Sequence, residues 1–261
     1  MSAILETNNL TIGYTQKTRE TVVSQKINLC FEKGTLVALL GENGVGKSTL
    51  LRTLSGVQNS LKGMVSIKGK DLKSYTHKEL ATTVSLVLTT RLPESQLTVF
   101  ELIALGRQPY TNWVDTLTAI DLEKITWAME ETAVTSLKEQ PIFELSDGQL
   151  QRVLIARALA QDTDLILLDE PTAHLDIHHT FNVFSLLEKL AKTTKKTIIV
   201  STHEVNLAIQ YADQLVLLTK DEVRAGTVAS LQSENVFENL FPKEHVSFNR
   251  TLQQFVVRTS I

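Results

Sequence analysis

The stretch "GENGVGKST", Gly41–Thr49, decides the fold of this chain. It fits the pattern G-x-x-x-x-G-K-[ST], in which the glycines let the backbone curl so that its NH groups point inward at phosphate oxygens. An apolar run that favours a strand, "TLVALL", precedes the loop, and a helical pattern, "STLLRTLSG", follows it. A glycine-rich turn with an incidental lysine is the alternative, but this strand and helix are the context that a phosphate-binding loop requires.

The side chains of this loop predict a site for a nucleoside triphosphate and Mg²⁺. Lys47 is a positive point charge for the β- and γ-phosphates. The Ser48 hydroxyl can ligate Mg²⁺, and the Thr49 hydroxyl can hydrogen-bond a phosphate. The candidate nucleotide-binding residues of the loop are Gly41, Glu42, Asn43, Gly44, Val45, Gly46, Lys47, Ser48 and Thr49.

Two acidic residues end a second apolar run, "LILLDEP". At a strand end, Asp169 can hold Mg²⁺ through water, and Glu170 can polarise a water molecule aimed at the γ-phosphorus. His203 follows a third apolar run, "TIIVST", and can contact the γ-phosphate there. Taken alone, the two acids fit equally well as residues satisfied by the backbone, and a lone histidine at a strand end is more often structural. Beside the phosphate loop they become catalytic candidates, together with Lys47.

The stretch "FELSDGQLQRVLIARALA", Phe143–Ala160, predicts a helix whose start attracts anions. Ser146 can cap the first turn while Gln149 reaches back to it, which is a capping box. A helix N-terminus carries partial positive charge and free NH groups. A plain N-cap would look the same in the sequence, and the phosphate loop already provides one anion site, so the purpose of a second is open at this point.

Composition excludes several classes of protein. Of the 261 residues, 43% are hydrophobic and 21% charged, and the net charge is −3, so a basic nucleic-acid surface is not expected. Cys30 is the single cysteine, which excludes an intrachain disulfide. The N-terminus has no basic segment followed by an apolar one, and no apolar run reaches the ~20 residues of a membrane span. We therefore expect a cytosolic protein.

The order of predicted elements indicates an α/β core with two added parts. Nearly continuous apolar runs alternate with helical patterns, as in a parallel sheet covered on both faces. Alternating runs with turn signals predict an N-terminal antiparallel β subdomain, and a mostly helical stretch predicts an inserted helical subdomain. We expect the first part of the core with the antiparallel strands at 1–90, the helical subdomain at 91–160, the rest of the core at 161–229, and a C-terminal extension at 230–261. This extension has two candidate strands, "HVSFNR" and "QQFVVR", and no predicted role.

In this order the motifs resemble those of the ATP-binding subunits of ABC (ATP-binding cassette) transporters, which have a P-loop NTPase (RecA-like) core. "GENGVGKST" resembles the Walker A loop, "LILLDEP" the Walker B strand, "LSDGQ" the signature motif, "HLD" the D-loop and "STHE" the switch-histidine loop. The resemblance spans about residues 3–225. It places Asp176 in the D-loop. It also places Tyr14, by pattern alone a half-buried strand aromatic, where the family stacks adenine.

The resemblance assigns the anion-attracting helix start to a second chain. Two subunits of this family pair head to tail, so that Ser146, Asp147, Gly148 and Gln149 of one copy close over the γ-phosphate held by Lys47 of the other. ATP then holds a homodimer together, and hydrolysis opens it by adding charge repulsion. Asp147 stands where many family members have glycine, and it brings a carboxylate near the phosphate.

Another position departs further from the family pattern. The strand "TVSLVL" should be followed by a glutamine that contacts the metal, but Thr89 takes its place. A threonine hydroxyl can still ligate Mg²⁺ or a water molecule, although it is shorter. Thr89 therefore joins Ser48 and Asp169 in the expected metal set.

The resemblance also implies work at a membrane. Because the chain has no predicted span, we expect integral-membrane permease subunits as partners and a peripheral place on the cytoplasmic face of the inner membrane. The segment "LTVFELIALGRQPY", Leu97–Tyr110, is similar to one in the ATPases of iron-siderophore, haem and cobalamin importers, although an ordinary helix end has the same pattern. We expect an ATPase that powers import of such a metal chelate or of cobalamin, with a substrate-binding protein as a further partner.

Two alternatives would use the same chemistry. The first is the ATPase of an exporter or of a lipid- or lipoprotein-release system. The second is a soluble ABC ATPase that acts on nucleic acid, which usually needs two cassettes in one chain or a long coiled-coil insertion. The sequence shows neither feature, so no nucleic-acid partner is expected.

Overall fold

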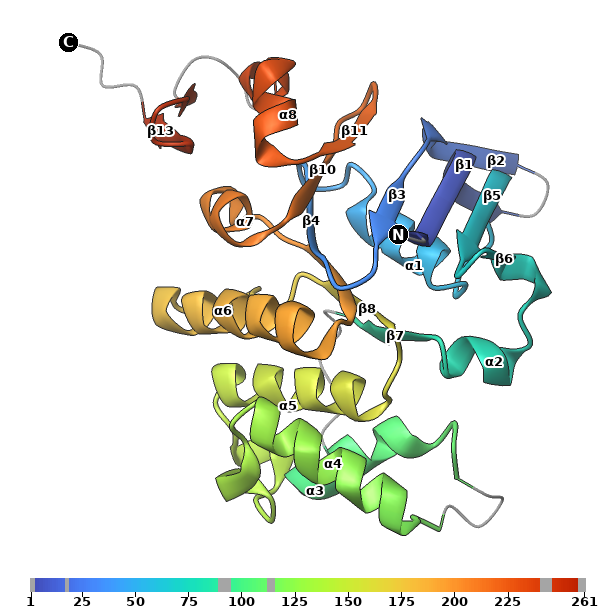
Figure 1. Ribbon diagram of the computed structural model, residues 1–261, viewed down its shortest axis with the longest axis vertical. Coiled ribbons are helices and arrows are strands. Elements are labelled where there is room, and N and C mark those ends of the chain that lie inside the picture. Colours follow the sequence, from blue (N-terminus) through green and yellow to red (C-terminus); the bar gives the residue numbers. More distant parts are fainter. Residues whose placement is uncertain (1–2, 17–18, 89–94, 112–115, 240–245, 258–261) are drawn as a thin grey trace.

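The computed structural model describes residues 3–16, 19–88, 95–111, 116–239 and 246–257. Figure 1 shows a central sheet with helices around it, an antiparallel sheet beside its upper half, and a group of helices at the lower end. This is the predicted α/β fold, with a β-rich part and a helical part added to a P-loop core. Across the described ranges, none of the helices combines the length and apolar character that crossing a bilayer would take.

The central sheet has six strands in the order β11-β10-β4-β9-β8-β7. Pairing is parallel from β7 to β10, and β11 joins the edge antiparallel. Every residue of β4, β8 and β9 is buried, which explains why their sequences are continuous apolar runs rather than alternating ones. The strand bounds are β4 Leu36–Leu40, β7 Val84–Val87, β8 Leu165–Asp169, β9 Thr197–Ser201, β10 Gln214–Leu218 and β11 Val223–Gly226.

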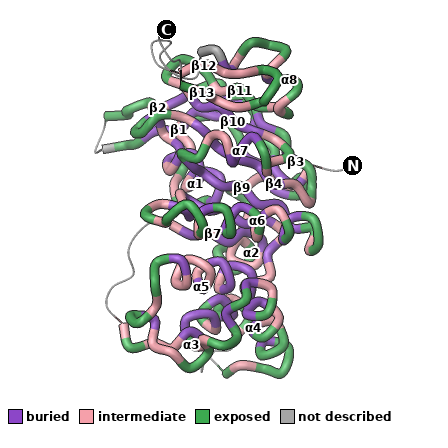
Figure 2. The backbone as a smooth tube through the Cα atoms, turned by 90° about the vertical axis from the view of Figure 1, so that its left-hand side faces the viewer, coloured by how far each residue is buried: buried purple, intermediate pink, exposed green. Residues whose placement is uncertain are grey.

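Helices and a second sheet cover this central sheet, so the buried residues run through the middle of the molecule (Figure 2). α1, Lys47–Leu54, and α6, Ile177–Thr194, turn apolar faces to two separate core clusters. The second sheet is antiparallel, with the order β2-β1-β5-β6 and β3 also paired with β1. Its strands are β1 Ala3–Gln16, β2 Arg19–Ile27, β3 Cys30–Glu32, β5 Lys62–Ile67 and β6 Lys70–Asp71. The predicted antiparallel strands are thus confirmed.

The helices at the lower end of Figure 1 pack closely around α5. A side chain at Gly106 would meet the backbone oxygen of Arg157 at 2.4 Å, so glycine allows the chain after α3 to approach α5. Arg107 is 3% exposed; its Nε donates to Asp121 Oδ1 at 2.8 Å and its Nη1 to the Ala160 carbonyl at 2.8 Å. The "ALGR" sequence therefore fixes helix packing. The helices are α3 Val99–Ala104, α4 Ala119–Glu131 and α5 Asp147–Ala160.

The C-terminal part forms a hairpin that packs on α7, Val205–Tyr211. Its strands, β12 Val246–Asn249 and β13 Gln254–Val257, confirm the two strands predicted there. Phe248 stacks on the buried Phe237 with ring centroids 4.5 Å apart, and Asn206 of α7 hydrogen-bonds both the NH and the carbonyl of Phe255. The remaining helices are α2 His77–Ala81 and α8 Val228–Ser233, with short 3-10 turns at Leu72–Ser74, Leu105–Arg107, Thr135–Leu137, Ile142–Glu144 and Val236–Asn239.

Candidate functional site

The predicted phosphate loop connects the end of β4 to the start of α1. Gly46 is the N-cap of α1 with φ 117°, a conformation that other residues rarely adopt, and a side chain there would meet Val23 at 2.4 Å. Gly41 leaves the strand with φ 158°, and a side chain on it would meet the carbonyl oxygen of Leu218 at 2.4 Å. The two glycines therefore permit a backbone path that no larger residue would follow without strain.

Lys47 lies beneath this loop, and its side chain is only 4% exposed. Its ammonium donates to the carbonyl oxygens of Gly41 at 3.0 Å and Glu42 at 3.2 Å. Burial lowers the pKa of Lys47, while the nearby carboxylate of Glu170 acts in the opposite direction. The loop thus concentrates a cation and several backbone NH groups at one end of the sheet, which is an arrangement that can bind phosphate.

The Asp169 carboxylate lies where the loop meets the end of β8, with β9 between β8 and β4 in the sheet. Ser48 Oγ donates to Asp169 Oδ1 at 3.0 Å, and Ser201 Oγ donates to the same oxygen at 2.7 Å. Asp169 and Ser201 are opposite each other in the β8–β9 register, so the parallel sheet itself brings the two side chains together. Sequence reasoning missed Ser201. The signal available was its position near the end of "TIIVST", the apolar run that also leads to His203.

Glu170, His203 and Lys47 form one cluster at this edge of the sheet. Glu170 Oε1 lies 2.7 Å from His203 Nε2 and 3.6 Å from Lys47 Nζ. Glu170 has φ 47°, and its NH donates to the backbone oxygen of Ser201 at 3.1 Å and to its hydroxyl at 2.9 Å. A left-handed non-glycine residue costs of order 1 kcal/mol or more, and such residues concentrate at functional sites. The bonds to Ser201 hold the strained backbone in place.

Tyr14 lies on β1 beside the phosphate loop. The residue is 43% exposed, and its hydroxyl is 2.5 Å from Thr49 Oγ1. The antiparallel sheet therefore brings an exposed aromatic face next to the phosphate loop, where it can stack on a base.

The start of α5 has the capping box that the sequence predicted. Ser146 accepts a hydrogen bond from the NH of Gln149, and Gln149 Oε1 accepts one from the NH of Ser146. Ser146 and Asp147 are exposed, whereas Gly148 is buried. Asp176 is the N-cap of α6 and accepts from the NH of His179 at 2.9 Å. Within the part of the chain that the structure describes, neither the start of α5 nor the Asp176 turn hydrogen-bonds Lys47, Glu170 or His203. Thr89, the further predicted metal ligand, lies outside the described residues.

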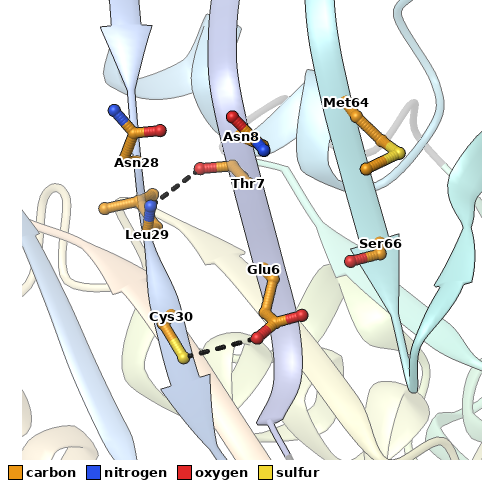
Figure 3. A pocket seen from close by; sticks show the side chains of 8 residues that line it. All are labelled: Glu6, Thr7, Asn8, Asn28, Leu29, Cys30, Met64 and Ser66. Atoms are coloured by element: carbon orange, nitrogen blue, oxygen red, sulfur yellow. Dashed lines mark hydrogen bonds between the residues drawn. The ribbon is translucent and has the colours of Figure 1, made fainter.

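A separate pocket lies on the solvent face of the antiparallel sheet and shares no lining residue with the phosphate loop (Figure 3). Its side chains come from β1, β5, β3 and the residues just before β3, and those labelled in the picture are Glu6, Thr7, Asn8, Asn28, Leu29, Cys30, Met64 and Ser66. Burial, followed by the charge of Glu6 and its hydrogen bond with the thiol, raises the pKa of Cys30. A pocket with a carboxylate and a protonated thiol does not favour phosphate.

A phosphate loop between a parallel strand and a helix, with two acidic residues at a nearby strand end, defines a P-loop nucleoside triphosphatase. The family model described as "ABC transporter" matches residues 24–173. The chain belongs to the ABC transporter family, as one of its ATP-binding subunits, and these subunits are ATPases.

Similarities to individual proteins of known sequence or structure support this assignment. The iron(3+)-hydroxamate import ATP-binding protein of Bacillus subtilis is 37% identical over 91% of this chain and 87% of its own length. A chain of an inward-facing ABC transporter assigned to the metal-chelate type is 28% identical, with a TM-score of 0.78 over 98% of this chain and 96% of that one. A dimeric ATP-binding cassette in a post-hydrolysis state, bound to ADP and Pi, is 26% identical, with a TM-score of 0.73 over 85% of this chain and 98% of that one.

Proposed function

We propose that this chain hydrolyses Mg-ATP within an ATP-bridged pair of copies and thereby drives import of a metal chelate of the iron–siderophore type through a separate permease. The proposal of ATP hydrolysis rests mainly on one cluster of side chains. In it, Glu170 Oε1 lies 2.7 Å from His203 Nε2 and 3.6 Å from Lys47 Nζ. The cargo class is supported by the similarity to the iron(3+)-hydroxamate import protein of Bacillus subtilis and to a transporter chain of the metal-chelate type.

Each residue of the cluster has a distinct role in this proposal. Lys47 binds the β- and γ-phosphate oxygens, which replace its present carbonyl partners. Glu170 accepts a proton from a water molecule whose oxygen attacks the γ-phosphorus, and ADP leaves with the electrons of the broken phosphoanhydride bond. His203 orients this water and contacts the γ-phosphate. Tyr14 stacks on adenine, and the NH groups from Gly41 to Thr49 bind the phosphates.

The residues present fit Mg²⁺. Ser48 Oγ and Asp169 Oδ1 are 3.0 Å apart, and both are hard oxygen donors of the kind Mg²⁺ prefers. Among the described residues no group of three His, Cys, Asp or Glu side chains could hold a metal ion alone. That fits an ion that takes its other ligands from phosphates and water. When bound, Mg²⁺ would neutralise charge on the β- and γ-phosphates, and Thr89 remains a proposed further ligand.

In the proposed function, the anion-attracting start of α5 binds the ATP of the partner copy. Ser146, together with the partial positive charge of the start of α5, binds the γ-phosphate held by Lys47 of the partner, and Asp176 approaches the same site. The dimeric form of the similar cassette supports this arrangement. Asp147 and Gly148 belong to the same contact. We further propose that residues 91–160 are a helical subdomain, whose described helices α3, α4 and α5 pack together and present Ser146 to this contact.

The pair of copies binds integral-membrane permease subunits at the cytoplasmic face of the membrane, and a substrate-binding protein delivers the chelate. The experiment that tests the cargo uses the chain copurified with its permease in proteoliposomes, with radiolabelled ferric hydroxamate and its binding protein as probe. ATP-dependent uptake that disappears in Glu170→Gln supports the proposal. ATP hydrolysis without uptake, across ferric hydroxamates, haem and cobalamin, would contradict the import of these chelates.

A further inference from the structure

His179 lies three residues after Asp176 and is held by it twice. Asp176 Oδ1 accepts a hydrogen bond from the backbone NH of His179 at 2.9 Å, and Asp176 Oδ2 lies 2.8 Å from His179 Nδ1. The carboxylate therefore accepts from a protonated Nδ1 and fixes the plane of the imidazole ring. The ring cannot turn without losing this second contact.

The imidazole packs directly on Gly148, in the first turn of α5. A side-chain carbon added to Gly148 would lie 2.2 Å from Cδ2 and 2.7 Å from Cγ of the His179 ring. Gly148 is thus buried by a residue of its own chain, and the absence of a side chain there provides the space for the imidazole. Gly148 and Asp176 belong to two different segments that the proposed function directs at the partner's ATP.

α5 and α6 share one buried core, which includes Val153 and Val183. α5 and α6 have few close backbone approaches, and a cavity of about 350 Å³ lies beside the contact, lined among others by Gly148, Arg152, His179 and Asn182. His179 therefore bridges the starts of the two helices beside this cavity. A rigid bridge at this point transmits a displacement of one segment to the other.

We propose that His179 is a positioning residue that holds the start of α5 and the Asp176 turn in one fixed relation, so that both engage the ATP of the partner copy together. The inference rests on the proposed ATP-bridged pair. His179 acts through Asp176 and Gly148 and does not itself touch the nucleotide. It has no part in nucleotide binding by the phosphate loop of its own chain.

The test uses Glu170→Gln chains, which are expected to keep ATP and stay paired, in sedimentation velocity with Mg-ATP. Adding His179→Ala should raise the dimer dissociation constant by about tenfold, equivalent to about 1.4 kcal/mol. The affinity of the lone chain for a fluorescent ATP analogue, measured below the dimerisation range, should not change. His178→Ala alters the neighbouring exposed histidine and is the matched control.

Two further variants separate positioning from simple stability. His179→Gln keeps a donor for Asp176, and His179→Phe keeps a ring for Gly148, so each should retain part of the dimer affinity. A merely structural role would lower the thermal midpoint of unfolding and the nucleotide affinity of the lone chain together. The inference is overturned if His179→Ala pairs as tightly as its parent. If the Glu170→Gln parent does not pair at all with Mg-ATP, the ATP-bridged pair of the proposed function fails, and the inference fails with it.

Discussion

The Ser201 hydroxyl donates to Asp169 Oδ1 at 2.7 Å, and the two residues face each other across neighbouring parallel strands. The same hydroxyl accepts the NH of Glu170 at 2.9 Å. One buried oxygen atom therefore orients the proposed metal-binding carboxylate and fixes the backbone of the proposed base.

Replacing Ser201 by alanine should affect both residues at once. Loss of a buried hydrogen-bonding group costs about 1–3 kcal/mol of stability. Because the carboxylates also lose their orientation, we expect the kcat for ATP to fall at least about tenfold, in line with misplaced catalytic groups. Ser85→Ala is the control, since Ser85 is equally buried, on β7, and accepts a hydrogen bond from Thr163. Equal loss of ATPase activity in both variants would contradict the assigned role of Ser201.

Breaking the buried ion pair of the helical part should destabilise the protein. Arg107 and Asp121 are 3% and 2% exposed, and Arg107→Met would leave the Asp121 carboxylate buried with one partner fewer. Such a change costs about 3–5 kcal/mol in the free energy of unfolding, and Arg107→Met with Asp121→Leu should cost less than the single change. Urea denaturation measures both values. A single variant within about 1 kcal/mol of the wild type would show that the pair contributes little.

Asp164 should make stability depend on pH. Burial acts to raise the pKa of this carboxyl, but hydrogen bonds and charge from Lys33 and Lys68 outweigh it and lower the pKa to about 2. A folded pKa below the unfolded value of about 3.9 gives stability that is present above pH ~4 and lost as the pH falls toward 2. After allowance for solvent screening, Asp164→Asn should lower the free energy of unfolding by about 1 kcal/mol at pH 7.

Urea unfolding of the wild type and Asp164→Asn between pH 3 and pH 7 measures this contribution. The difference between their free energies of unfolding should become smaller as the pH falls from about 4 to 3. Asp221→Asn, which alters an exposed carboxylate, should give no such convergence. A difference that stays constant with pH would mean that Asp164 is not stabilised by the two lysines.

Cys30 should react more slowly with thiol reagents than a cysteine of ordinary pKa. Burial and the carboxylate of Glu6 raise the pKa of this thiol, so less of the reactive thiolate is present at pH 8 (Figure 3). Glu6→Gln should lower the pKa and speed alkylation at that pH. The rate of reaction with iodoacetamide across pH 7–10 gives both pKa values, and an unchanged profile in Glu6→Gln would contradict the role of the carboxylate.

The sequence predicted the strands of the core because their burial on both faces forces continuous apolar runs, as in Leu165–Asp169. It also predicted the capping box at Ser146 and Gln149, since a cap depends only on residues three apart. Ser201 and His179 escaped prediction for the opposite reason. Their partners, Asp169 and Gly148, are 32 and 31 residues distant along the chain, and only strand register or helix packing brings each pair together.

The proposed mechanism requires two copies of the chain to make one complete ATP site. Specific ATPase activity, measured with sedimentation over a dilution series of the wild-type chain, tests this directly. We predict that the rate per chain falls toward zero as dilution converts pairs into lone copies, and that Ser146→Ala lowers the rate at every concentration. A rate per chain that stays constant at dilutions where sedimentation detects only lone copies would contradict the account.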